Sequence, residues 1–177
     1  MLNTTRKFKA DRSGLAAVEF ALVLPILLVM VFGSIEVTNV LTVKTDVTNI
    51  TSAAADLVAQ ESTIGDTDMT NIFSAMNALI YPYASGNTKI VITSVIDDGH
   101  GGGKVAWSDA LHTTARTTGT AVTVPTGLIT TGGSVVMSEV TYTYTTPSTY
   151  LVKIPVTFTN TFYSHPRRVA QIARTHP

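Results

Sequence analysis

Glu19 is the residue whose position most directly indicates chemistry. It is the one ionisable side chain in the 21-residue apolar run from Leu15 to Ile35. A carboxylate deep in a bilayer costs about 2.5 kcal/mol or more, so such residues usually serve a partner. The position therefore predicts that Glu19 is there for a partner. The alternative is that Glu19 lies at the headgroup level and pairs only loosely with Arg12.

The other residue types that carry chemistry form no catalytic or metal-binding pattern. The chain has no cysteine and no serine-nucleophile motif, and its histidines lack metal-ligand spacing. These scattered histidines are His100, His112, His165 and His176. We therefore expect no enzyme, no catalytic residue, no metal and no cofactor.

The element that must position Glu19 is a membrane-spanning helix over residues 15–35. At helical rise these residues extend about 31 Å, which matches the hydrocarbon core of a bilayer. The preceding leader, residues 1–14, carries a net charge of +3, which predicts a cytoplasmic N-terminus and an exported remainder. A cleaved secretory signal would have a shorter apolar region with a small-residue cleavage site directly after it. A buried core helix would carry a polar face.

The composition of the chain agrees with this division. Its 177 residues allow one exported domain, and its mean hydropathy of +0.27 comes largely from the single apolar run. Twelve basic and 12 acidic residues cancel, which argues against a nucleic-acid partner. The two parts of the chain carry opposite net charges. Residues 1–14 carry +3, and residues 15–177, with 8 basic and 11 acidic side chains, carry −3.

The segment around Glu19 resembles the leader junction of type IV pilins. In residues 12–20, RSGLAAVEF, a short basic leader ends in glycine and a glutamate stands five positions into the apolar helix. More narrowly, residues 14–37 resemble the opening of the TadE/TadG-like proteins of bacterial tight-adherence (Flp) pilus systems. The positions that match that pattern are Gly14, Glu19, Phe20, Pro25, Gly33 and Glu36.

The resemblance implies processing by a membrane-embedded prepilin peptidase, which would cut the bond between Gly14 and Leu15. Cleavage would leave an α-ammonium on Leu15, with Glu19 four residues away in the same chain or opposite it in a neighbouring subunit. In pilins the matching glutamate is thought to pair with a neighbour's N-terminus and to guide assembly. The implied partners are the peptidase, other Tad/Flp pilins, the inner-membrane assembly platform and membrane lipid.

The function that the resemblance implies is that of a TadE-like minor pilin or pseudopilin in Flp pilus assembly. An exported portion of about 140 residues is too large for the bulk subunit of such a filament. We expect one pass through the bacterial inner membrane, with a periplasmic C-terminal domain, and incorporation in the extracellular pilus stays open. The alternative is an uncleaved single-span protein that presents a Thr-rich β domain as an adhesin or binding module. An exported enzyme ranks last.

Two residues could weaken the spanning helix. Pro25 removes one helical hydrogen bond and frees the carbonyl of Ala21, and Gly33 is a second weak point. Two interpretations of these residues are open. They allow the helix to stretch when it packs in a filament, or they cause a kink that the helix merely tolerates.

After the span, apolar residues recur every three or four positions over residues 36–61. This predicts an amphipathic continuation of the same helix, with a break near Gly33 or Thr38 left open. The predicted apolar stripe consists of Val37, Val40, Leu41, Val47, Ile50, Ala54, Leu57 and Val58. We expect it to pack on the protein's own sheet.

Residues 62–177 predict an exported α+β domain, with a helix over about 67–81 and strands over about 88–163. Asp66, Thr67 and Asp68 would cap that helix, and a calcium site is disfavoured because this cluster lacks the later ligands of a calcium loop. Its predicted apolar face is Ile72, Phe73, Met76, Leu79 and Ile80.

Four segments read as strands. Residues 89–96 are β-branched and predict a central strand, and the glycine-rich turn 97–103 predicts a hairpin to a short strand over 104–108. Residues 134–145 and 151–163 alternate as strands, and Pro155 predicts an edge position or a bulge for the last one. The tail from Pro166 is expected to be a short helix or a loose end. The expected fold class is α+β, a long N-terminal transmembrane and amphipathic helix packed on a C-terminal antiparallel sheet, pilin-like, with a single span.

Overall fold

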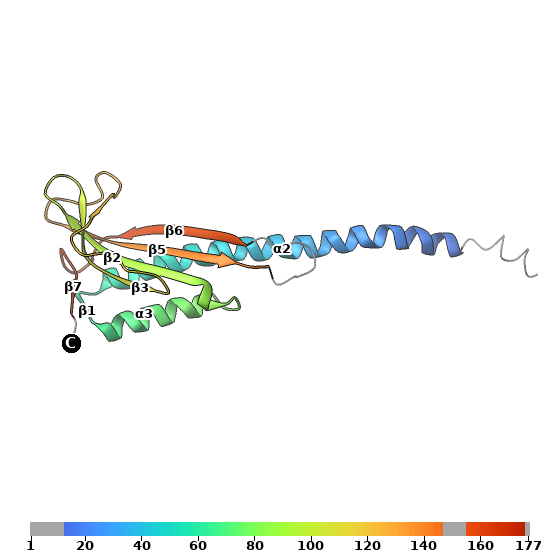
Figure 1. Cartoon of the computed structure of the whole chain (residues 1–177), viewed down its shortest axis with the longest axis horizontal. Coiled ribbons are helices and arrows are strands. Elements are labelled where there is room, and N and C mark those ends of the chain that lie inside the picture. The colour runs from blue at the N-terminus through green and yellow to red at the C-terminus, as the bar shows by residue number, and fades with distance from the viewer. Residues whose placement is uncertain (1–12, 147–154, 176–177) are drawn as a thin grey trace, which may run out of the picture. The chain divides into compact units, whose positions relative to one another are not determined.

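The computed structural model describes residues 13–146 and 155–175 (Figure 1). It confirms the α+β fold, with a long N-terminal helix, α2 (Ser13–Gln60), and an antiparallel sheet. The chain divides into two compact units, residues 1–39 and 40–177, and α2 contributes to both. Residues 1–12 of the basic leader and residues 151–154, at the start of the last predicted strand, lie outside the described residues.

Helix α2 is continuous through Pro25, Gly33 and Thr38, so the break that the sequence left open does not occur. Hydroxyl groups along the helix donate to carbonyls one turn earlier. Ser34 Oγ lies 2.8 Å from the Val31 carbonyl oxygen, and Thr38 Oγ1 lies 2.9 Å from that of Ser34. These bonds satisfy polar side chains inside an otherwise apolar helix.

Within the second unit, one face of α2 is buried. The predicted stripe is correct for Val47, Ile50, Ala54 and Val58, which are all buried. Val37, Leu41 and Leu57 are exposed instead, at 60%, 57% and 38%. Leu41 lies about half a turn from the buried Val43, because two residues rotate a helix by about 200°.

Helix α3 (Asp66–Leu79) corresponds to the helix expected over 67–81. Asp68 caps it, because the backbone N–H of Gly65 donates to Asp68 Oδ2 at 2.9 Å. Ile72, Met76 and Ile80 are buried as predicted, whereas Leu79 is 48% exposed. A short 3-10 helix, η1 (Ser85–Asn87), leads into the sheet.

The sheet has five strands in the order β4-β3-β2-β5-β6. Its strands are β2 (Thr88–Asp97), β3 (Gly103–Leu111), β4 (Ala121–Val122), β5 (Ser134–Tyr144) and β6 (Val156–Ser164). All neighbouring pairs are antiparallel, and β2 and β3 form the predicted hairpin. The positions of β2 at the centre and β6 at an edge agree with the predictions, and Pro155 directly precedes β6.

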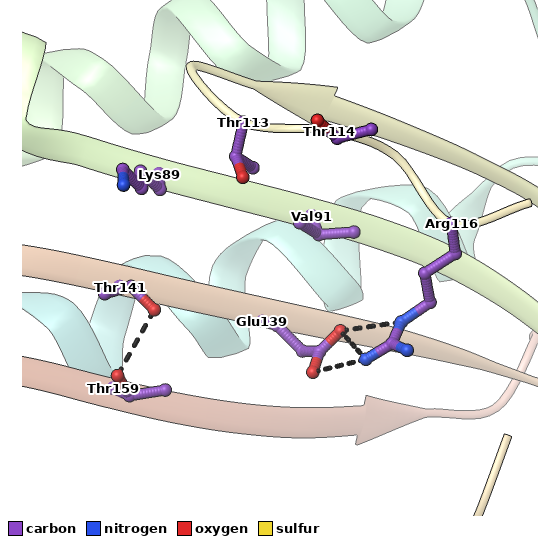
Figure 2. A pocket seen from close by; sticks show the side chains of 8 residues that line it. All are labelled: Lys89, Val91, Thr113, Thr114, Arg116, Glu139, Thr141 and Thr159. Atoms are coloured by element: carbon purple, nitrogen blue, oxygen red, sulfur yellow. Dashed lines mark hydrogen bonds and ion pairs between the residues drawn. The ribbon is translucent and has the colours of Figure 1, made fainter.

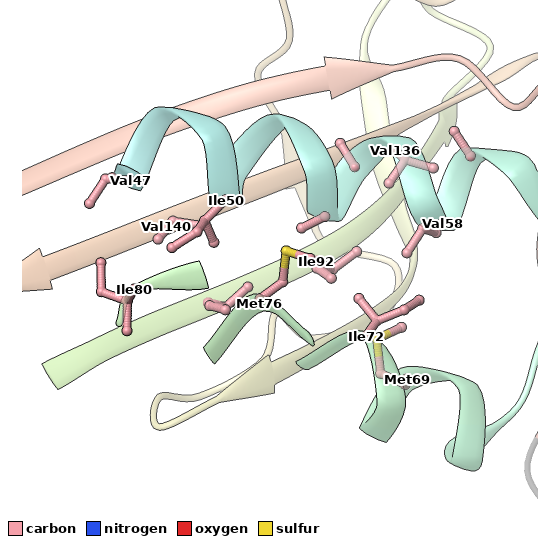
Figure 3. Close-up of a cluster of buried hydrophobic side chains, with 14 of the residues drawn as sticks. Val47, Ile50, Val58, Met69, Ile72, Met76, Ile80, Ile92, Val136 and Val140 are labelled. Atoms are coloured by element: carbon pink, nitrogen blue, oxygen red, sulfur yellow. The ribbon is translucent and has the colours of Figure 1, made fainter. Parts of the chain in front are cut away.

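The main core lies between one face of the sheet and the two helices. Ile50 of α2, Met76 of α3 and Ile92 of β2 belong to one cluster of buried side chains (Figure 3). Each such side chain stabilises the fold by about 1.5–3 kcal/mol relative to its exposed state. A smaller cluster of Val95, Val105, Val122, Val135 and Met137 forms a second core. Phe162 lies on the edge strand β6 and is 40% exposed.

The C-terminal tail is neither a helix nor a loose end, so that prediction is wrong. Strand β7 (Ala173–Arg174) pairs in parallel with β1 (Thr63–Ile64). The indole Nε1 of Trp107 donates to the carbonyl of the buried Ile172 at 2.8 Å. The tail acquires its structure from partners far away in the sequence, which local periodicity does not reveal.

Candidate membrane-anchor and processing site

The predicted cleavage site lies in the first turn of α2. Gly14 and Leu15 follow Ser13, where the described helix begins, and the Leu15 side chain is 61% exposed. Glu19 is exposed one turn further on. Residues four apart in a helix lie on the same face, so the helix aligns the Leu15 backbone end with the Glu19 carboxylate.

Packing within the described structure does not require glycine at position 14 or position 33. A Cβ atom built on either residue would meet no described atom within 4 Å, and neither has a positive φ. This observation separates the two glycines from Gly103, which the fold does require.

The helix surface around these residues is apolar and exposed. From Leu15 to Ile35 the large hydrophobic side chains are 36–70% exposed, and Leu22 has the highest value. Among the described residues, α2 is the one helix long and apolar enough to cross a membrane. An apolar surface of this extent calls for lipid or protein to cover it. It supports the expected membrane anchor.

The remaining predicted site residues are distributed along the same helix. Phe20 is 60% exposed, Pro25 is exposed within the helix, and Gly33 and Glu36 are half-buried. The described part of the chain contains no ion pair to Glu19, and Arg12 lies outside it.

The acidic residues before α3 have structural roles. Asp68 caps the helix, and Asp66 pairs with the guanidinium of Arg174. Within residues 13–146 and 155–175, no group of three or more His, Cys, Asp or Glu side chains could hold a metal ion. No local pattern indicated the Arg174 contact, because its partners lie 65 and 108 positions earlier in the chain.

Comparison with known proteins identifies the N-terminal segment. Residues 14–56 match the family model described as TadE-like protein. The match begins at Gly14, covers about a quarter of the chain and includes every predicted site residue. It confirms the resemblance and connects the chain with the Tad pilus system. Comparisons with curated proteins and with solved structures give no significant match.

Proposed function

We propose that this chain, TadE-like over residues 14–56, is a membrane-anchored minor pilin or pseudopilin that takes part in Flp/Tad pilus assembly. A prepilin peptidase cleaves it after Gly14, and residues 36–177 lie on the periplasmic side of the inner membrane. The observation that carries the proposal is the junction itself. A glycine without a packing role precedes an exposed apolar helix whose only ionisable side chain up to Ile35 is Glu19.

The geometry suits cleavage followed by lateral pairing. Cutting the Gly14–Leu15 bond removes a leader of charge +3, which otherwise holds the N-terminus in the cytoplasm. The new ammonium on Leu15 then stands at the same end of the helix as the Glu19 carboxylate. Such charges attract more strongly where water is scarce, so the carboxylate of one subunit favours the ammonium of the next. The partners are the peptidase, other Tad/Flp pilins and the assembly platform.

Intact-mass measurement on membranes tests the cleavage. With the peptidase present we expect a chain that begins at Leu15, and without it a chain that begins at Met1. Gly14→Leu should block cleavage, whereas the matched change Gly33→Leu should not, because both glycines have free space around the Cβ position. A wild-type chain that keeps residues 1–14 in the presence of active peptidase would refute the processing.

The alternative, an uncleaved anchor that presents a binding domain, rests on the Thr-rich outer face of the sheet. Two threonine pairs bridge β5 and β6 there, Thr141 with Thr159 and Thr143 with Thr157, each at 3.2 Å between hydroxyl oxygens. Glu19→Leu separates the two functions. A simple anchor tolerates the change, whereas a pilin component loses pilus assembly while staying in the membrane. Ser34→Leu, another polar-to-apolar change on the same helix, is the control.

A further inference from the structure

The outer face of the sheet carries a polar groove of about 450 Å³. Its floor is formed by residues of odd number, such as Lys89 and Glu139, whose neighbours Ile90 and Val140 point into the core on the opposite face. Figure 2 shows the floor side chains on adjacent strands, with the helices behind the sheet. The volume falls within the roughly 300–1,000 Å³ of small-molecule sites.

The strand register arranges the floor in two rows. Lys89, Thr141 and Thr159 stand opposite one another across β2, β5 and β6. Val91 and Glu139 form the next row, about 7 Å further along the strands. The floor therefore combines the Lys89 cation, the hydroxyl groups of Thr141 and Thr159, the Glu139 carboxylate and the apolar Val91. These groups lie close enough together to contact one or two sugar rings.

A loop that contains Arg116 walls one side of the groove. The Arg116 backbone N–H donates to Ser108 Oγ at 3.2 Å, and Ser108 Oγ lies 2.9 Å from Thr93 Oγ1. The Arg116 guanidinium donates to both carboxylate oxygens of Glu139 (Figure 2). Nη2 lies 2.8 Å from Oε1 and from Oε2, and Nε lies 3.1 Å from Oε2. This bidentate pair fixes the loop against the floor. The exposed hydroxyl groups of Thr113 and Thr114 line the same wall.

The charges in the groove are not balanced. The carboxylate of Glu139 neutralises Arg116, which leaves Lys89 with no ion pair among the described residues. The groove thus offers one positive charge, one carboxylate that accepts hydrogen bonds, and hydroxyl groups that both donate and accept.

We propose that this groove binds a carboxylate-bearing saccharide, with its carboxylate on Lys89 and its hydroxyl groups on the threonines and Glu139. A ligand with a single carboxylate matches the single free cation. Its hydroxyl groups donate to the carboxylate oxygens of Glu139, and a single free positive charge does not match a densely charged anion such as phosphate. Val91 offers an apolar contact for the C–H face of a sugar ring. The inference does not depend on cleavage at Gly14.

Binding of an aldobiouronic acid, a disaccharide with a single uronate carboxylate, to the full-length chain in detergent, measured by calorimetry, tests the proposal. We expect binding that weakens with salt, and about tenfold weaker binding for Lys89→Met, because a hydrogen bond to a charged group is lost. Lys89→Arg keeps the charge and should retain most of the affinity. Lys104→Met, an exposed lysine of β3 outside the groove, is the matched control.

Three further probes distinguish the ligand chemistry. Thr141→Val and Thr159→Val should each weaken binding several-fold without loss of the folded state, which thermal unfolding checks. A neutral galacto-oligosaccharide should bind more weakly than the uronate, and equal affinity would overturn the role of Lys89. Equal or tighter binding of an acidic peptide, or no binding of the uronate up to millimolar concentration, would overturn the proposal.

Discussion

Arg174 joins three elements of the second unit through a single side chain. It is 6% exposed, bonds the Asp109 carboxylate of β3 at 2.8 Å, and pairs with Asp66 at the start of α3. Its Nη1 also donates to the Ile64 carbonyl of β1 at 3.2 Å. The hydrogen bond to the Asp109 carboxylate raises the pKa of Arg174 above its already high ordinary value, so Arg174 stays positively charged. The side chains of Asp109 and Asp66 are 23% and 49% exposed, so loss of the nearly buried guanidinium leaves chiefly Asp109 without its partner in a partly buried position.

Arg174→Met should therefore lower the free energy of unfolding by about 2 kcal/mol or more. Urea unfolding followed by the fluorescence of Trp107, the only tryptophan, measures the change. Arg167→Met is the control, because the Arg167–Asp56 pair is 56% and 43% exposed and should contribute less than about 1 kcal/mol. Equal effects of the two changes would contradict the role of Arg174.

Asp97 makes the β2–β3 turn sensitive to acid. The backbone N–H groups of Gly132 and Gly99 donate to its carboxylate and lower its pKa below the ordinary value. A pKa lowered by folding stabilises the protein above the unfolded-state value near 4, and this stabilisation is lost as the pH falls through the folded-state value. Between pH 5 and about pH 3, wild-type stability should fall more steeply than that of Asp97→Asn. Parallel pH profiles of urea unfolding would contradict this.

Among the elements, the β2–β3 hairpin requires a glycine at the start of β3. A Cβ on Gly103 would lie 2.6 Å from Val95 Cγ1 and 3.2 Å from the Val122 carbonyl oxygen. Gly103→Ala should therefore destabilise the fold by about 1–3 kcal/mol, as overpacking does. Gly86→Ala, where a Cβ meets nothing within 4 Å, should change stability by less than about 0.5 kcal/mol. Thermal unfolding of both variants checks the contrast.

The long elements were predictable from the sequence, and the short ones were not. Apolar periodicity identified the second half of α2, α3, β5 and β6, and continuous apolar or β-branched runs identified the first half of α2 and β2, because each segment is long enough to show its pattern. Strands β1, β4 and β7 have two residues each and show none. Their existence depends on partners elsewhere in the chain, such as Ile64 for Arg174.

At the scale of the whole molecule, the proposed cleavage changes the net charge. The precursor is neutral, and loss of the +3 leader leaves a chain of −3. Two-dimensional electrophoresis of membranes should therefore show a mature species that is both smaller and more acidic than the precursor. Gly14→Leu should accumulate only the neutral form. A smaller species that focuses at the precursor position would contradict cleavage at this bond, because a cut elsewhere keeps basic residues.

The sequence alone determined the apolar helix, its Gly14–Glu19 junction and the α+β class, because hydropathy and periodicity are local properties. Only the tertiary structure decided which face of α2 is buried, how the tail is held, and which side chains share the outer groove. Lys89, Arg116 and Glu139 are far apart in the chain and meet through strand register and loop folding. Such encounters depend on long-range packing, which no local pattern encodes.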